Sequence, residues 1–494
     1  MKMSLSESTV LAASWLAGAK LISRSVDILT LLILARFLLP ADFGIVAMAM
    51  SAVLIAEAVA ELPLLQALTR VPRLTRRLLD TAFTLAFIRG SVLALVLFLI
   101  SWPLAAFYEE PRVQPLVVFL ALAPVLRGLV SPKLAVYIRK LDFRPESAIL
   151  LISRVSTLLV SALVVIITES YWAIAAGTLI SPLVMITCSY AVAPYRPRFS
   201  LSGWSAFADI IGWNSLSQIF SASNWQMGRV LLGKIADKTT LGNYTMAANI
   251  VSIPQRALIM PLTRPLMSAF SKTRDPIKLR SGYLKTMSSV WLVASPIFIT
   301  LALLSQPLVI MALGESWAGI SHLLAFEAIA ALLAVPFSIL APLAMSLNRT
   351  RLVAMRTGIE LAIGLPVTIV AIVQYGVAGL VISRVGISLL MLLVHLFLIR
   401  QLIALSIAKQ SHQLFRALLA SVPLIISLLL FRPWIDALTI GAPLVLGTGL
   451  AATVSFVVYL SIVFGCWHLS GRPDGLEQQF LNLYKRLIIR RVFH

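Results

Sequence analysis

Long apolar stretches alternate with short polar segments along the whole chain. The first runs from Val10 to Leu39 with few interruptions, and similar stretches recur up to residue 465. A stretch of about 18 or more apolar residues is long enough to cross the hydrocarbon core of a bilayer as a helix. Strands of an outer-membrane barrel would instead be about ten residues long with alternating polarity. The pattern therefore predicts an all-α integral membrane protein.

The apolar stretches divide into fourteen expected transmembrane helices. We place them at 10–38, 42–68, 81–108, 113–136, 148–168, 171–193, 205–233, 239–270, 286–311, 317–345, 352–374, 377–399, 415–431 and 440–465. The loops between these helices are short. No soluble domain is therefore expected between them.

Basic residues test this count, because the cytoplasmic loops of membrane proteins are enriched in Lys and Arg. With the N-terminus inside, 27 of the 41 Lys and Arg residues fall in inner segments and 5 in outer segments, while 9 lie within helices. If one helix were missed or wrongly added, the basic segments beyond it would fall on the outer side. The distribution favours fourteen helices with both termini cytoplasmic.

Composition agrees with this class of protein. The chain has 494 residues, of which 59% are hydrophobic and 12% charged, and its mean hydropathy is +0.94. A net charge of +21 would suggest nucleic acid in a soluble protein, but here membrane topology explains it. The two cysteines, Cys188 and Cys466, lie in or at the end of apolar segments and indicate neither a disulfide framework nor a thiolate metal site.

Motifs for nucleotide, metal or nucleophilic chemistry are not expected. The stretch "GRVLLGKI" resembles a phosphate-binding loop, but Ile235 stands where Ser or Thr would bind magnesium, and no strand is expected before it. The five histidines are scattered and match no metal or triad pattern. We therefore expect no cofactor and no metal, and we do not expect an enzyme.

A shift of 198 residues reveals an internal repeat. It superposes "LARFLLPADFG" on "LGKIADKTTLG", so that Arg36 meets Lys234 and Gly44 meets Gly242, and residues 15–64 contain nine ungapped identities. The offset covers six helices, so both copies have the same orientation. Parallel repeats of this kind form two lobes, with the substrate path between them. The expected lobes and extension are 1–200 (helices 1–6), 201–410 (helices 7–12) and 411–494 (helices 13 and 14 with a basic tail).

The first hairpin, "LARFLLPADFGIVAMA", resembles the Wzx-type polysaccharide-transport branch of the multidrug/oligosaccharidyl-lipid/polysaccharide (MOP) exporter superfamily. The motif residues are Leu34, Ala35, Arg36, Pro40, Asp42, Phe43 and Gly44. The resemblance implies a flippase that moves polyprenyl-diphosphate-linked oligosaccharide repeat units across the bacterial inner membrane by alternating access. Its product would feed the synthesis of an exopolysaccharide, a capsule or O-antigen. Relatives often have an acidic residue where Gly228 stands here, so the resemblance does not extend to ion coupling through that carboxylate.

Ionisable residues within the helices are the candidates for function, because each is costly in hydrocarbon. The nine cations are Lys20, Arg24, Arg89, Arg127, Arg154, Arg229, Arg256, Arg264 and Arg384. The acids are Asp27, Glu57, Glu61, Glu327 and Glu360. The excess of cations suits an anionic cargo.

The first candidate site is a cavity that grips the substrate diphosphate. Lys20, Arg24 and Asp27 share one face of helix 1, and Arg256 and Arg264 lie in a helix that three prolines should break. Arg is favoured for phosphate because its planar group binds two oxygens. The alternative is that these charges pair with Asp27 or with acids of helix 2 and hold helices together. Arg89, Arg127, Arg154 and Arg384 are expected to be structural.

Three further groups complete the candidate residues. Glu57 and Glu61 share a face of helix 2 and are candidates for ion coupling. The polar lining for sugars is expected from Asn214, Gln218, Asn224, Gln226, Asn249 and Gln255, with hydrogen bonds between helices as the alternative. The outer-rim motif, with a structural and gating role, comprises Arg36, Pro40, Asp42 and Gly44.

Other functions remain open at this point. A lipid II flippase of the same superfamily would share the fourteen-helix plan and the need for cations. A multidrug or cation antiporter would favour an acidic cavity and about twelve helices, and a membrane glycan polymerase or ligase would need a long periplasmic loop. The expected partners are the lipid-linked substrate, membrane lipids, a polysaccharide polymerase and a chain-length regulator, with no nucleic acid and no nucleotide.

Overall fold

The chain forms two compact units of helices in a computed structural model. The structure describes residues 5–60, 62, 64–71, 73–140, 142–204, 207, 226, 228–259, 262–273 and 275–469. The first unit comprises Met1–Met246 with Leu365–Gly379, and the second comprises Ala247–Gly364 with Leu380–His494. Within the described ranges every regular element is helical, which confirms the all-α prediction.

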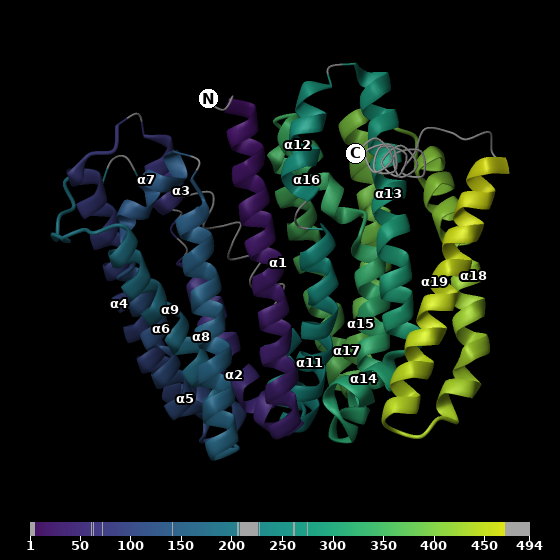
Figure 1. Cartoon of the computed structure of the whole chain (residues 1–494), viewed down its shortest axis with the longest axis horizontal. Helices are drawn as coiled ribbons and strands as arrows, with labels where there is room; N and C mark the ends of the chain where they lie inside the picture. The colour runs from purple at the N-terminus through teal and green to yellow at the C-terminus, as the bar shows by residue number, and fades with distance from the viewer. Residues whose placement is uncertain are drawn as a thin grey trace, which may run out of the picture. The chain divides into compact units, whose positions relative to one another are not determined.

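The first unit contains most of the expected helices 1 to 6. Its elements are α1 (Leu5–Phe37), α2 (Pro40–Val59), α3 (Leu64–Arg70), α4 (Arg76–Tyr108), α5 (Val113–Leu120), α6 (Leu122–Gly128), η1 (Pro132–Leu134), α7 (Ala135–Arg139), α8 (Arg144–Thr168), α9 (Trp172–Val192) and the first half of α11 (Lys238–Pro254). Helix α8 packs against α1 on one side and α9 on the other, while α4 packs against α5 and α6 (Figure 1).

Local capping fixes where these helices begin and end. Pro40 is the first residue of α2. The Asp42 carboxylate accepts a hydrogen bond from the backbone N–H of Leu39, the residue that precedes the helix. Thr75 caps the start of α4 with its hydroxyl, so α4 begins five residues before the expected 81. Glu109 ends α4 in the left-handed conformation, with φ 56°.

The expected single helix at 113–136 is wrong in detail, because this segment is broken. It forms α5, α6, η1 and α7, and the axis bends by 50° between Val113–Gly128 and Pro132–Arg139. Pro132 opens η1 and cannot donate a backbone hydrogen bond, so the helix cannot run straight through it. At the break the backbone N–H of Ser131 donates to the Ser189 hydroxyl, and this buried bond ties the bend to α9.

The second unit contains the second half of α11 and the elements that follow it. These are η2 (Gln255–Ile259, a π-helix), α12 (Thr263–Lys272), α13 (Pro276–Leu303), α14 (Ser305–Leu313), η4 (Glu315–Ile320), α15 (Ser321–Ala334), α16 (Phe337–Ser346), α17 (Thr350–Ile403), α18 (Ile407–Asp436) and α19 (Ala442–Leu469). The middle of α17, Leu365–Gly379, belongs to the first unit. Helix α13 packs against α15 and α18, and α18 packs against α19. The proline-rich break expected between 239 and 270 is confirmed, because α11 ends at Pro254 and a π-helix follows.

Helix α17 is interrupted by a kink at Gly376. This glycine has φ 58° and ψ −134°, a conformation that side chains disfavour, and it lies between the expected helices 352–374 and 377–399. A straight helix of 54 residues would be roughly 80 Å long, which is far more than the roughly 30 Å of a bilayer core. Each half of α17, before and after Gly376, is long enough for one span.

Long apolar helices recur throughout both units. Nine helices within the described residues are long and apolar enough to cross a membrane, or up to ten if the bent pair is one span, with α17 counted once. Helices α13 and α18 begin earlier than the expected 286 and 415, because Asp275 and Ser406 cap them. The expected seventh helix lies largely outside the described residues. The chain is a multi-pass membrane protein.

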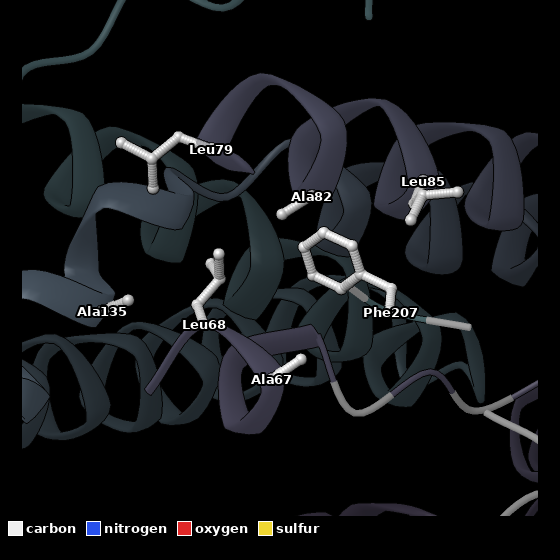
Figure 2. Packing of buried hydrophobic residues seen from close by; sticks show 7 residues of the cluster. All are labelled: Ala67, Leu68, Leu79, Ala82, Leu85, Ala135 and Phe207. Atoms are coloured by element: carbon white, nitrogen blue, oxygen red, sulfur yellow. The ribbon is translucent and has the colours of Figure 1, made fainter. Parts of the chain in front are cut away.

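A buried apolar cluster lies at the end of the first unit where α1 begins. It contains Ala67, Leu68, Leu79, Ala82, Leu85, Ala135 and Phe207. Figure 2 shows the Phe207 ring against the side chains that α3 and α4 contribute. Because Phe207 follows α9 in the chain, this cluster anchors the connection after α9 to the start of α4.

Candidate functional site

The first unit brings two arginines onto one carboxylate where α1 packs against α8. Nη1 of Arg24 lies 3.0 Å from Oδ2 of Asp27, one turn later on α1. Nη1 of Arg154, on α8, lies 3.5 Å from Oδ1 of the same carboxylate. We call these three residues the arginine cluster. The side chains are 39%, 30% and 38% exposed for Arg24, Asp27 and Arg154, so a ligand can reach them.

The residues that precede the two arginines are small and buried. Ser23 on α1 and Ser153 on α8 immediately precede the two arginines, and both are almost fully buried. Their hydroxyls donate to backbone oxygens within their own helices, Ser23 to Lys20 and Ser153 to Leu150. Helices α1 and α8 pack against each other, and the ion pair between Arg154 and Asp27 joins them.

The arginine cluster has a net charge of +1. A single carboxylate occupies only part of the ten N–H groups that two guanidinium groups offer. The remaining donors can bind the oxygens of a phosphate in the fork geometry that arginine favours. The ion pair expected under the structural alternative is present as well, since Asp27 binds Arg24. Arg154 was expected to be structural, and nothing in the local sequence signals that it meets Asp27.

The remaining predicted cations do not all fall in this unit. Lys20 lies on α1 with its side chain exposed. Arg256 lies in the π-helix of the second unit, also exposed, and Arg264 lies in α12 with its side chain outside the described part. The structure therefore brings Arg24 and Asp27 together, and places Arg256 in a separate unit.

The predicted polar lining is described only in part. Asn214, Gln218 and Asn224 lie outside the described residues. Gln226 is buried and accepts a hydrogen bond from Arg229 at 3.5 Å. Asn249 and Gln255 are half-buried in the second unit.

Glu57 is the centre of a contact between three helices. Its carboxylate on α2 binds Nη1 of Arg127 on α6, and its backbone oxygen accepts a hydrogen bond from Arg89 on α4 at 3.1 Å. This arrangement agrees with the structural role expected for the two arginines. Glu61 lies outside the described residues, so ion coupling by Glu57 and Glu61 stays a prediction.

The outer-rim motif forms a reciprocal contact between repeat-related segments. A Cβ added to Gly44 on α2 would overlap the backbone oxygen of Lys238, the first residue of α11. A Cβ added to Gly242 on α11 would overlap the backbone oxygen of Pro40, the first residue of α2. Both glycines are therefore required by close approach of two helix starts, and the pairs 44/242 and 40/238 each differ by the 198-residue offset. Arg36 itself is exposed.

Ion pairs flank this crossing at the end of α4. Lys234 Nζ lies 2.7 Å from Glu109, and Lys238 Nζ lies 3.1 Å from Glu110. Arg112 also binds Glu110 through two parallel hydrogen bonds of 2.7 and 2.9 Å. These bonds lower the pKa of Glu110 to about 2, and the hydrogen bonds from Arg112 have the largest effect. The segment before α11 is thus fastened electrostatically to the end of α4.

Other charged groups of the second unit are paired within it. Arg384 lies 3.4 Å from Glu327, and Arg356 lies 3.0 Å from Glu360. Within the part of the chain that the structure describes, no group of three or more His, Cys, Asp or Glu side chains is placed to hold a metal ion.

Comparison with known proteins gives consistent matches. The model of the family described as "Polysaccharide biosynthesis protein" matches residues 33–322. The chain is 24% identical over 340 residues to the lipopolysaccharide biosynthesis protein WzxC of Escherichia coli (strain K12), covering 67% of this chain and 68% of that protein. It is 24% identical over 307 residues to the succinoglycan biosynthesis transport protein ExoT of Rhizobium meliloti (strain 1021), covering 62% of each.

The fold is also shared with a solved transporter. The structure of the lipid II flippase MurJ in an inward closed conformation superposes with a TM-score of 0.72, covering 91% of this chain and 98% of that chain. Sequence identity in this superposition is 13%, so the likeness concerns the fold alone.

Proposed function

Since the chain belongs to the polysaccharide biosynthesis protein family and to the Wzx-type flippases of the MOP superfamily, we propose that it moves polyprenyl-diphosphate-linked oligosaccharide repeat units across the bacterial inner membrane. The flipped units would supply the synthesis of an exopolysaccharide, a capsule or O-antigen. The proposed cargo has an anionic diphosphate, a polar glycan and a lipid tail. A protein that moves it must offer cations within the membrane and leave the tail in the bilayer.

The arginine cluster is the observation that carries this proposal. Arg24 and Arg154 converge from two helices on Asp27 and remain partly exposed, and the cluster carries one net positive charge on helices that we propose to lie in the membrane. Asp27 would hold both guanidinium groups in place between transport cycles, and the diphosphate would compete for their N–H groups. In the second unit, Arg256 is the corresponding candidate, with Lys20 and Arg264 as secondary ones.

The proposed architecture is fourteen helices in two parallel six-helix lobes, with two further helices at the C-terminal side. The reciprocal Gly44 and Gly242 contact supports the repeat, because equivalent residues of the two copies exchange equivalent contacts. The proposed lobes are residues 1–200 and 201–410, and the proposed topology places both termini in the cytoplasm. Transport would proceed by alternating access of the headgroup site to the two sides.

An ion gradient or the membrane potential is the proposed driving force. The membrane potential contributes about 2.3 kcal/mol per elementary charge per 100 mV. The proposed cargo is anionic, so net movement of charge with it would respond to this potential.

Substitution of the cluster arginines tests the proposal. Arg24→Ala and Arg154→Ala should each weaken binding of a polyprenyl-diphosphate oligosaccharide by about 10- to 100-fold, because a charged hydrogen-bonding group is lost. Arg256→Ala should also leave lipid-linked units on the inner leaflet. The measurements are binding to the purified protein and translocation of the same lipid in reconstituted vesicles.

Asp27→Asn is the matched control. If the cluster only holds α1 against α8, removing Asp27 should be as damaging as removing Arg154, because either change breaks the ion pair that joins the two helices. If the arginines bind the diphosphate, Asp27→Asn should keep or strengthen binding, since both cations remain. Equal loss of binding in all three variants, or undiminished polymer output from the arginine variants, would contradict the proposal.

The identity of the lipid-linked cargo separates this proposal from a lipid II flippase. The shared fold with MurJ concerns architecture and leaves the cargo to be measured. On depletion of the protein, lipid-linked intermediates should accumulate with the sugars of a surface polysaccharide. Accumulation of the peptidoglycan precursor instead would favour the second function.

A further inference from the structure

The connection that follows α9 is fastened along its length to the first unit. Residues 193–204, which we call the strap, run from the end of α9 past the start of α4. The Tyr195 hydroxyl donates to the Asp80 carboxylate. The backbone N–H of Ser200 donates to Thr84 at 2.9 Å, and that of Gly203 donates to Thr81 at 3.0 Å. Three bonds to one helix fix the inner face of the strap on α4.

Further contacts, from the region of η1 at one end and from α4 at the other, hold both ends of the strap. The Ser131 hydroxyl donates to the backbone oxygen of Ala193 at 3.0 Å, and Lys133 Nζ donates to that of Pro194 at 2.9 Å. Near the other end, Nε of Arg77 donates to the Ser202 hydroxyl at 2.9 Å. These bonds therefore hold the strap in one position on the first unit.

The outward face of the strap combines large apolar side chains with arginines. Phe199 is 70% exposed, Leu201 51% and Trp204 48%. Arg196 and Arg198 are exposed as well, and the strap contains no acidic residue. Aromatic and apolar groups exposed beside cations are unfavourable in water alone, but they fit the interface between hydrocarbon and lipid headgroups.

The position of the strap relative to α4 indicates the same interface. An apolar stripe on α4, formed by Ile88, Val92, Leu95 and Leu99, is 43–62% exposed and faces the position of lipid tails in a membrane-spanning helix. Phe199 packs on Phe83 and Phe87 at ring-centre distances of 5.9 and 5.5 Å, in the turn just before this stripe begins. The strap thus lies where the apolar stripe ends.

Further cations surround the strap at the same end of the unit. The exposed ones are Arg73, Arg76, Arg77, Arg139 and Lys140. The nearby Asp80 carboxylate is buried and is already bound to Tyr195, with Arg76 at 3.9 Å. The electrostatic field at this surface therefore attracts anions.

We propose that the strap binds the headgroups of anionic phospholipids in the leaflet on its side of the membrane. Phe199, Leu201 and Trp204 enter the interface, and Arg196 with Arg198 binds the phosphates. The bonds to α4 order the strap before lipid arrives, so binding does not carry the entropy cost of ordering a loop. This surface is separate from the arginine cluster, and the proposal does not rest on the transported substrate.

Quenching by brominated lipids tests this proposal. The protein carries a fluorescent label at Leu201→Cys in a background with Cys188→Ala and Cys466→Ala, and is reconstituted into phosphatidylcholine vesicles that contain phosphatidylglycerol. Either lipid is brominated in turn. Each cation near an anionic surface contributes about fivefold to binding. We expect brominated phosphatidylglycerol to quench at least about fivefold more effectively per molecule than brominated phosphatidylcholine, and the preference to fall in high salt.

Variants separate lipid recognition from simple exposure. Arg196→Gln with Arg198→Gln should reduce the preference at least about fivefold, whereas the matched pair Arg349→Gln with Arg351→Gln, also exposed, should leave it unchanged. Equal quenching by both lipids, or an unchanged preference in the strap variant, would overturn the proposal. So would a label that is quenched by an aqueous reagent and by neither lipid, which would assign the surface to water or a soluble partner.

Discussion

At the scale of single residues, Glu109 and Glu110 show how neighbouring carboxylates acquire different roles. Glu109 is 80% exposed and has one lysine partner. Glu110 is 13% exposed and is bound by both Arg112 and Lys238. An exposed ion pair contributes little, because water and salt screen it, whereas a carboxylate held by two cations loses several directed bonds when it is neutralised.

Neutralising these two carboxylates gives a residue-scale prediction. Glu110→Gln should lower the melting temperature of the purified protein at neutral pH, and Glu109→Gln, the control, should leave it nearly unchanged. Because the pKa of Glu110 is lowered in the folded state to about 2, its contribution is complete above its ordinary pKa and is lost as the pH falls from about 4.5 toward about 2.

The difference between wild type and Glu110→Gln should therefore shrink over that acidic range and stay constant between pH 5 and 8. Thermal unfolding measured as a function of pH checks this. A difference that changes most near neutral pH would show that another group is responsible.

At the scale of elements, the crossing of α2 and α11 depends on two glycines. Each helix begins against the second turn of the other, and neither contact leaves room for a Cβ. A methyl group cannot be accommodated by a rotamer change, because the overlapping atom belongs to the backbone. The two helix starts would have to move apart.

Gly44→Ala and Gly242→Ala should each destabilise the protein by about 1–3 kcal/mol or more, through overpacking. Gly282→Ala on α13 is the control, since nothing lies within 4 Å of its added Cβ, and it should be neutral or stabilise by up to about 1 kcal/mol. Thermal unfolding in detergent measures all three. Similar stability of Gly44→Ala and Gly282→Ala would show that the helix starts are not in close contact.

At the scale of the whole molecule, the alternation of basic loops predicts the orientation in the membrane. Fusion of reporters after Ser202 and after Glu315 should give a cytoplasmic and a periplasmic signal respectively, because an odd number of expected helices separates the two positions. The reverse signals would invert the topology, and signals on the same side would show that the helix count between them is wrong.

Much of the fold was predictable because its signals are local. The apolar stretches, the Pro40 and Asp42 start of α2, the break after Pro254 and the turn at Gly376 follow from the preferences of residues close together in the chain. The bend at Pro132 was missed because neighbouring apolar residues masked it. Early helix starts were missed because caps extend helices past the apolar stretch.

The candidate site was also predictable from the sequence only in part. By itself the sequence determined the membrane class, the excess of cations and the face shared by Arg24 and Asp27, since each depends on composition or on helical spacing. Only the tertiary structure decided that Arg154 completes the cluster, that Glu57 is bound by Arg127, and that the strap lies on α4. The physical reason is that these contacts join residues distant in the chain, and only the packing of separate helices brings such residues together.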